Sequence, residues 1–102
     1  MSQALRTKIL EAIKANEAMV FSKSYCPFCA RAKQALKQVG AEFAVWELDK
    51  MPEGSEVQNL LQKMTGQRTV PNIYVKETHI GGCDDLIAAI ASNKVQRLIN
   101  GK

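Results

Sequence analysis

The sequence predicts an α/β fold in which helices cover a four-stranded mixed sheet. Two apolar runs, residues 19–21 and 43–48, flank a segment with helical spacing, which predicts a parallel βαβ unit. Two further runs, residues 72–75 and 78–80, are separated by only two residues and predict an antiparallel hairpin. The length supports one modest hydrophobic core, so we expect residues 1–102 to form a single domain.

Apolar residues at helical spacing predict five helices around these strands. Leu5, Ile9 and Ile13 recur every four residues and mark an amphipathic first helix. The second helix should begin at Pro27, because proline lacks an N–H that the first turn would leave unpaired, and end before Gly40. The other three helices are marked by Val57, Leu60, Leu61 and Met64, by Leu86, Ile87 and Ile90, and by Val95, Leu98 and Ile99.

Composition excludes several classes of protein. The content of 46% hydrophobic and 24% charged residues is ordinary for a globular domain. No apolar stretch approaches the length of a membrane span, and the N-terminus lacks the apolar region of a signal peptide. Three cysteines are too few, and odd in number, for a disulfide framework. We therefore expect a cytoplasmic protein without membrane association.

The net charge of +4 is concentrated in one segment. Residues 18–41 contain four basic and no acidic residues, and the rest of the chain is balanced. This basic segment is either a solvated helix face or a field that favours a thiolate and attracts an anionic substrate. Because the chain has neither a strong basic cluster nor interleaved aromatic residues, we expect no nucleic-acid partner.

The cysteine pair Cys26 and Cys29 is the most informative motif. It lies between an apolar run and a helical segment, so Cys26 should occupy the helix N-terminus, where the reactive thiolate is favoured. Cys29 shares a helix face with Leu36 and should point into the core. Cys26 is therefore the candidate nucleophile, and Cys29 is either a resolving thiol or a buried small residue. A C-x-x-C at the start of a βαβ helix is the redox arrangement of thioredoxin-like proteins.

A second candidate site precedes the fourth helix, where residues 81–85 read GGCDD. A turn followed by a helix cap explains this segment without any ligand. Alternatively, its free N–H groups bind a carboxylate and an Asp binds an ammonium group, which together fit an amino-acid-like ligand. We expect Cys83 to pack rather than react, and His79, the only histidine, to face solvent.

Three motifs in register resemble the dithiol glutaredoxins along essentially the whole chain. They are residues 23–29 (KSYCPFC), 67–71 (QRTVP) and 81–85 (GGCDD). The resemblance implies a thioredoxin fold with strand order 2-1-3-4. It also implies a cis Val70–Pro71 bond, whereas the position of Pro71 at the start of a strand is equally compatible with an ordinary trans bond. The commonest dithiol motif has Tyr in place of Phe28, a difference that leaves the reaction class unchanged.

The resemblance also implies glutathione as co-substrate, with no tightly bound cofactor, and a set of residues that bind it. Lys23, Gln58 and Arg68 would bind the glycine carboxylate of glutathione. The Val70 backbone would pair with its cysteinyl part, and Cys83 and Asp84 would bind its γ-glutamyl end. The remaining residues of the implied site are Tyr25, Phe28, Thr69, Pro71 and Gly82.

By resemblance, the activity is reduction of protein–glutathione mixed disulfides through Cys26, and of protein disulfides with Cys29 as resolving thiol. The partners would be glutathione and glutathionylated or disulfide-containing proteins, with the chain acting as a monomer.

The competing function is an iron–sulfur cluster carrier or redox sensor, in which a dimer shares a cluster through Cys26 and bound glutathione. Pro27 argues against it, because cluster-binding relatives often have a smaller residue there. Cys83 and His79 do not add a second closely spaced pair, so we expect no metal site.

Overall fold

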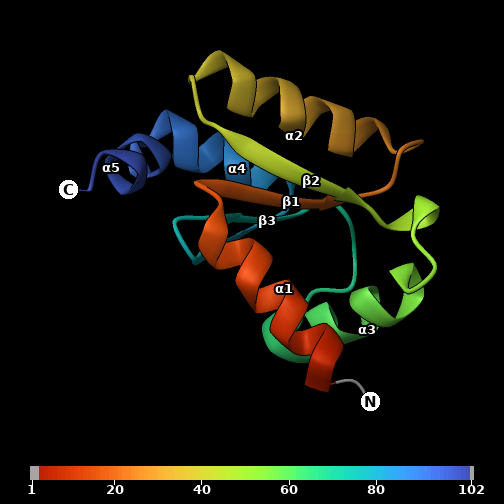
Figure 1. Ribbon diagram of the computed structural model, residues 1–102. Helices are drawn as coiled ribbons and strands as arrows, with labels where there is room; N and C mark the ends of the chain where they lie inside the picture. Colours follow the sequence, from red (N-terminus) through yellow and green to blue (C-terminus); the bar gives the residue numbers. More distant parts are fainter. Residues whose placement is uncertain (1–2, 102) are drawn as a thin grey trace.

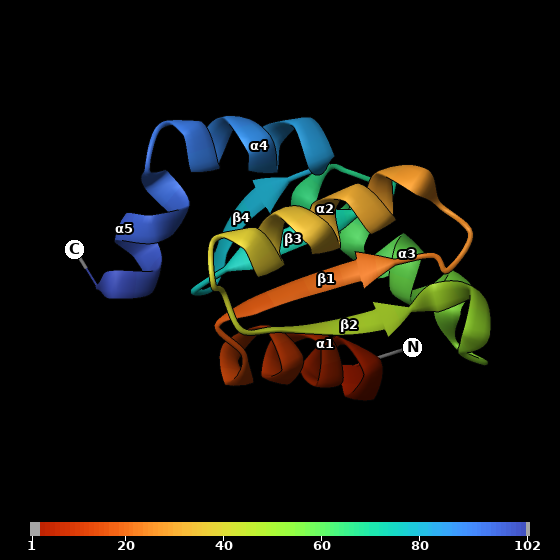
Figure 2. The same ribbon diagram turned by 90° about the horizontal axis from the view of Figure 1, so that it is seen from above.

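Helices cover both faces of a four-stranded sheet in the computed structural model, which describes residues 3–101 (Figure 1). The elements in chain order are α1 (Gln3–Ala15), β1 (Ala18–Ser22), α2 (Pro27–Gln38), β2 (Phe43–Glu47), the 3₁₀ helix η1 (Leu48–Lys50), α3 (Gly54–Thr65), β3 (Asn72–Val75), β4 (Thr78–Gly81), α4 (Cys83–Ala91) and α5 (Lys94–Asn100). Helices α2 and α4 cover one face of the sheet and α1 covers the other; seen from above, α2 lies in front of the strands (Figure 2).

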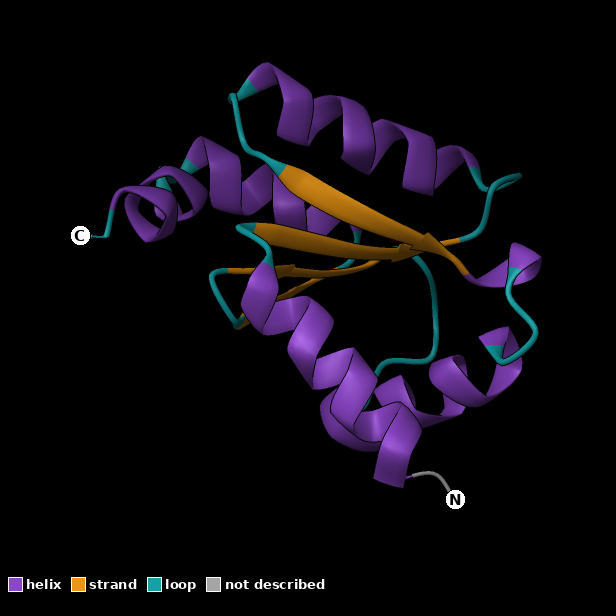
Figure 3. Cartoon of the chain, in the orientation of Figure 1, coloured by secondary structure: helices purple, strands orange, loops and turns teal. Residues whose placement is uncertain are grey.

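The strand order is β2-β1-β3-β4, which confirms the four-stranded mixed sheet predicted from the sequence and the order that the resemblance implied. Strand β1 pairs in parallel with β2 and antiparallel with β3, and β3 pairs antiparallel with β4. The cartoon coloured by secondary structure shows the long connection from α3 to β3 as the main loop of the chain (Figure 3). Among residues 3–101, no helix is long and apolar enough to cross a membrane.

Strand β1 is the centre of the molecule because both of its faces are covered. All five of its residues are buried. Val20 faces a core that includes Leu36 of α2 and Leu86 of α4. Phe21 faces a second core that includes Ile9 of α1. Coverage on both faces explains why this strand has a continuous apolar run instead of alternating polar and apolar residues.

Element boundaries differ from the predicted ones by a few residues. Strand β2 ends one residue early, because Leu48 begins η1, and α3 begins at Gly54 instead of near residue 57. Gly40 follows the end of α2 with φ of 76°, as expected for a helix terminator. In the hairpin turn, Lys76 and Glu77 adopt φ of 49° and 65°, the geometry that two-residue hairpins favour and that Asn-Gly usually supplies.

The topology brings the three sequence motifs to one end of the sheet. Strand β1 ends at Ser22 and leads through the cysteine turn into α2. Because β3 is antiparallel to β1, its first residue, Asn72, pairs with Phe21 near the end of β1. Gly81, at the end of β4, pairs with Ile73 of β3. The segments 23–29, 67–71 and 81–85 therefore converge.

Gly54 begins α3 directly against the backbone of η1, and a Cβ there would overlap the carbonyl oxygen of Leu48. We expect Gly54→Ala to lower the free energy of unfolding by about 1–3 kcal/mol, the usual cost of overpacking, even though alanine is the better helix former. Urea denaturation followed by circular dichroism measures this loss. Ser55→Ala, at the next and exposed position, is the matched control and should be nearly neutral. Equal stability of Gly54→Ala and the parent would contradict the prediction.

Candidate functional site

Cys26 is the N-cap residue of α2, and its sulfur takes the place of a capping oxygen. The Sγ atom accepts a hydrogen bond from the backbone N–H of Cys29 at 3.3 Å. The thiol lies 3.9 Å from the carbonyl oxygen of Val70, which faces it from the β3 side of the site. The side chain is half-buried. An N–H group and the positive end of a helix both favour a negatively charged sulfur at this position.

Cys29 lies one turn into α2 and is completely buried, which confirms that it points into the core. Burial raises the pKa of the Cys29 thiol, and the neighbouring Cys26 side chain raises it further. The Lys23 backbone and the Ser22 side chain, which lie near this thiol, act in the opposite direction and lower the pKa. Cys29 is therefore a protonated thiol at neutral pH, and the two cysteines are chemically different.

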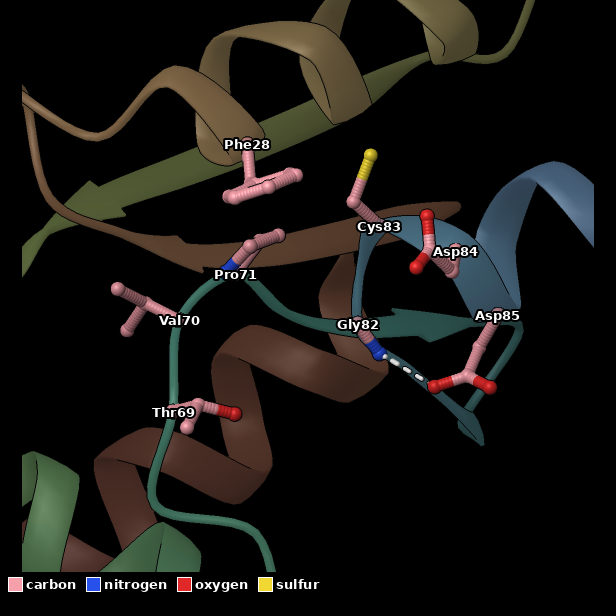
Figure 4. A pocket seen from close by; sticks show the side chains of 8 residues that line it. All are labelled: Phe28, Thr69, Val70, Pro71, Gly82, Cys83, Asp84 and Asp85. Atoms are coloured by element: carbon pink, nitrogen blue, oxygen red, sulfur yellow. Dashed lines mark hydrogen bonds between the residues drawn. The ribbon is translucent and has the colours of Figure 1, made fainter.

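A cavity of about 250 Å³ opens beside the cysteines, between the loop before β3 and the start of α4. The Phe28 ring and Pro71 lie on one side of it, and the first residues of α4 lie on the other (Figure 4). The Val70–Pro71 peptide bond is cis, as the resemblance implied. The cavity is lined by Phe28, Thr69, Val70, Pro71, Gly82, Cys83, Asp84 and Asp85.

Asp85 is the one lining residue that the resemblance did not include among the glutathione-binding residues. Its Oδ2 accepts a hydrogen bond from the Gly82 backbone N–H at 2.9 Å (Figure 4). Gly81 has φ of 119°, and a Cβ at this position would collide with the Asp85 carboxylate. Asp85 thus fixes the turn, while Asp84 is exposed at the cavity. An acidic residue at the third helical position is a known capping signal and was available in the sequence.

Cys83 is buried at the start of α4, as expected for a cysteine that packs. Burial raises the pKa of its thiol, as do Asp84 and Cys26, while Arg31 lowers it. The thiol form is therefore favoured at neutral pH.

Four of the residues predicted to bind glutathione do not line the cavity. Lys23 and Tyr25 lie in the loop beside Cys26, and Tyr25 is 71% exposed. The Gln58 side chain donates a hydrogen bond to the Arg68 carbonyl oxygen at 2.7 Å, and the Arg68 guanidinium is hydrogen-bonded to Asn59. These contacts attach the loop before β3 to helix α3.

The prediction that His79 faces solvent is wrong. Its Nε2 lies 2.9 Å from Oδ1 of Asn72, and its ring packs on Tyr74 with centroids 5.1 Å apart. Asn72 is buried and needs hydrogen-bond partners, and it also donates to the Gln67 carbonyl oxygen at 3.4 Å. Burial lowers the pKa of His79, and the Asp85 carboxylate partly opposes this shift. The pairing connects the residue after Pro71 to strand β4, and sequence alone could not show it.

A second polar contact joins the ends of strands β1 and β2. The Ser22 hydroxyl, which is buried, donates to Oε1 of Glu47 at 2.7 Å. The Lys33 ammonium donates to Oε2 of the same carboxylate at 2.8 Å. One of the four cations of the basic segment is therefore paired with an acid from another strand. Sequence reasoning did not single out Ser22 or Glu47.

Among residues 3–101, no three or more His, Cys, Asp or Glu side chains are grouped so that they could hold a metal ion. The described site thus consists of a half-buried thiol, a buried thiol and, next to them, a cavity with both apolar and polar lining residues. This arrangement suits thiol–disulfide exchange with a small peptide-like thiol.

Comparison with known proteins agrees with this chemistry. Residues 18–80 match the family model described as glutaredoxin. Glutaredoxin-1 of Rhizophagus irregularis is 43% identical over 99 residues, which cover 97% of each protein.

Solved structures are similar over nearly the whole chain. The holo form of glutaredoxin C1 from Populus tremula x tremuloides has a TM-score of 0.90 at 39% identity, covering 97% of this chain and 98% of that one. The buckwheat glutaredoxin–glutathione complex has a TM-score of 0.89 at 37% identity, covering 93% of this chain and 86% of that one.

The depressed pKa of His79 predicts a loss of stability in mild acid. Its ordinary pKa is 6.5 and its folded value is lower, so the unfolded chain binds the proton more readily. This contribution is fully present above about pH 6.5 and is lost as the pH falls through the folded pKa. We expect His79→Gln, which keeps a donor for Asn72 but does not titrate, to lose less stability on acidification. Urea denaturation between about pH 5 and 7.5 measures the slopes; parallel slopes would refute the assignment.

Proposed function

The chain belongs to the glutaredoxin family, the glutathione-dependent thiol–disulfide oxidoreductases, and from this premise we propose how its residues divide the reaction. Cys26 is the nucleophile and Cys29 is the resolving thiol. The observation that carries this assignment is the difference between the two sulfurs. Cys26 is half-buried and receives an N–H from the helix start, whereas Cys29 is buried and protonated.

Reduction of a protein–glutathione mixed disulfide needs only Cys26. Its thiolate attacks the glutathione sulfur, the bond to the protein sulfur breaks, and the protein leaves as a thiolate that takes a proton from solvent. A second glutathione thiolate then attacks the bound glutathione sulfur, which releases oxidised glutathione and the Cys26 thiolate. The helix N-terminus stabilises Cys26 as an anion, so it favours Cys26 as a leaving group in this second step.

Reduction of a protein disulfide uses both cysteines. Cys26 attacks one sulfur of the substrate and forms a mixed disulfide, and Cys29 then attacks the Cys26 sulfur. The second bond breaks, the substrate leaves with both sulfurs reduced, and the Cys26–Cys29 disulfide remains. Two glutathione molecules reduce this disulfide and become oxidised glutathione.

We place glutathione in the cavity between Pro71 and α4. The Val70 carbonyl faces the Cys26 sulfur, so a peptide running beside this backbone would present its own sulfur to Cys26. The N-terminus of α4 suits the γ-glutamyl carboxylate, and Asp84 suits its ammonium group. A relative that is 37% identical has been solved as a complex with glutathione, which supports this placement. For the remaining contacts we propose Lys23, Gln58 and Arg68 at the glycine carboxylate, with Tyr25, Phe28, Thr69, Pro71, Gly82 and Cys83 lining the groove.

Thiol exchange accounts for the site better than iron–sulfur cluster carriage does. A two-iron cluster takes four ligands, typically thiolates. Within residues 3–101 only Cys26 has a partly accessible thiol, because Cys29 and Cys83 are buried. One chain therefore does not complete the ligand set, and a cluster would need a second chain and bound glutathione, whereas thiol exchange needs one chain alone. We propose that the protein works as a monomer in the cytoplasm, where glutathione is available in its reduced form.

The two cysteines are separable by mutation. We expect Cys26→Ser to abolish reduction of both a small glutathione mixed disulfide and a protein disulfide, because the nucleophile is lost. Cys29→Ser should keep reduction of the glutathione mixed disulfide and lose most reduction of the protein disulfide. A coupled assay with glutathione, glutathione reductase and NADPH measures both activities. Equal losses in the two variants on the glutathione mixed disulfide would contradict the assignment.

Asp84 is expected to bind the substrate without entering the chemistry. Asp84→Asn should raise the KM for the glutathione mixed disulfide about fivefold with little change in kcat, because an exposed ionic contact contributes modestly. The matched control is Glu11→Gln, which removes one negative charge from the exposed face of α1. Steady-state kinetics at fixed ionic strength separates KM from kcat. An unchanged KM would remove Asp84 from the glutathione site.

A further inference from the structure

The Gln67 side chain holds the loop that forms one wall of the cavity. Its Nε2 donates one hydrogen bond to the Thr69 carbonyl oxygen at 3.1 Å and another to the Pro71 carbonyl oxygen at 2.9 Å. Both hydrogens of this amide are therefore used on backbone groups of the loop. Val70 lies between the two carbonyls that Gln67 binds, and residues 69–71 line the cavity (Figure 4).

The backbone groups of Val70 itself stay available to a ligand. Its carbonyl oxygen faces the Cys26 sulfur at 3.9 Å. Within residues 3–101, no backbone carbonyl oxygen accepts a hydrogen bond from the Val70 N–H. A peptide that lies along this wall needs a free donor and a free acceptor to pair with, as an added strand does at the edge of a sheet. Gln67 thus binds the carbonyls on either side of Val70 and leaves those of Val70 to the site.

The backbone of Gln67 is fixed on both sides. Its N–H donates to Oγ1 of Thr65 at 3.0 Å, and its carbonyl oxygen accepts from Nδ2 of Asn72 at 3.4 Å. The Thr65 hydroxyl gives its own hydrogen to the Leu61 carbonyl oxygen at 2.8 Å, so it is an acceptor for Gln67. Because Thr65 ends α3 and Asn72 begins β3, both elements hold the backbone from which the Gln67 side chain extends.

The orientation of the Asn72 side chain follows from its neighbours. The side chain is buried, and its Nδ2 faces two acceptors, the Gln67 carbonyl oxygen and the Thr65 hydroxyl at 3.5 Å. Its Oδ1 therefore accepts from Nε2 of His79 at 2.9 Å, and the neutral imidazole carries its hydrogen on that nitrogen. A chain of side-chain donors thus leads from β4 to the cavity wall: His79 donates to Asn72, Asn72 donates to Gln67, and the Gln67 amide donates to the loop.

We propose that Gln67 is a positioning residue for glutathione and that Asn72 and His79 support it. The Gln67 amide sets the direction of the two carbonyls that flank Val70, and this direction leaves the Val70 backbone groups to pair with the cysteinyl part of the ligand. Gln67 acts through the Val70 backbone and takes no part in bond making. The inference rests on the proposed placement of glutathione beside Val70. It adds a residue that determines the preference for a glutathione disulfide over a disulfide without a peptide backbone.

Two disulfides that Cys26 attacks in the same way test this role. Oxidised glutathione carries the peptide, and bis(2-hydroxyethyl) disulfide carries none. The reduced protein is mixed with an excess of either one, without free glutathione, and acid quenching with intact-mass measurement gives the rate constant for loss of the Cys26 thiol. Gln67→Met keeps the length of the side chain and removes both donors. We expect it to lower the ratio of the glutathione rate constant to the hydroxyethyl rate constant about fivefold, the loss from one weakened hydrogen bond.

Matched variants separate positioning from a general loss of structure. Gln62→Met makes the same change at an exposed position of α3 and should keep the parental ratio. His79→Leu removes the donor to Asn72 and should lower the ratio by a smaller factor than Gln67→Met, because His79 lies further from the loop along the chain of donors. His79→Gln supplies a donor again and should recover most of this loss. Thermal melting checks that all variants are folded.

The positioning role is wrong if Gln67→Met keeps the parental ratio, or if it slows the reaction with both disulfides by the same factor, since the change would then act on Cys26 and not on the peptide. It is also wrong if Gln62→Met lowers the ratio equally. The supporting role of His79 is wrong if His79→Gln and His79→Leu lower the ratio to the same extent. Failure of the proposed function gives a different result: the parent itself would show the same ratio as free cysteine.

Discussion

The complete burial of β1 is the constraint on which the rest of the structure depends. Both faces of this strand are covered, and both edges are paired, so its register with β2 and β3 is firmly set. That register determines what stands at its carboxyl end. Ser22 is held opposite Glu47, and Phe21 is paired with Asn72, the residue after the cis proline Pro71. The strand register therefore fixes which residues of the adjoining loops lie next to each other at the site.

The chemistry follows from placing two identical thiols in unlike surroundings. Cys26 caps a helix and receives an N–H, whereas Cys29 is one turn further and out of contact with water. One turn of α2 thus separates the partly accessible Cys26 sulfur from the buried, protonated Cys29 thiol. The cavity next to Cys26 is made from the starts of two helices and a loop, so it presents backbone groups that suit a peptide-like ligand.

Much of this could be predicted from the sequence, because the fold and the cysteine pair depend on local patterns. Apolar spacing and the short hairpin connection indicate the elements, and the motifs indicate the cavity residues. The contacts of Ser22 with Glu47 and of Asn72 with His79 could not be predicted. Each depends on the register between strands, and the type of a polar residue does not identify its hydrogen-bond partner. His79 was misplaced for this reason: an alternating strand assigns a face but does not show what covers it.

Because β1 is paired on both edges and covered on both faces, its backbone should open much more rarely than the turn that carries Cys26. Its backbone amides are hydrogen-bonded within the sheet and shielded on both faces, so they can exchange with solvent hydrogen mainly when the whole domain opens. The turn at residues 23–26 lies outside the ladder, and its Ser24 and Cys26 N–H groups are bonded only locally, to the Asp49 carboxylate and the Lys23 carbonyl oxygen. A cysteine turn can therefore rearrange through many redox cycles while the strand that supports it remains closed.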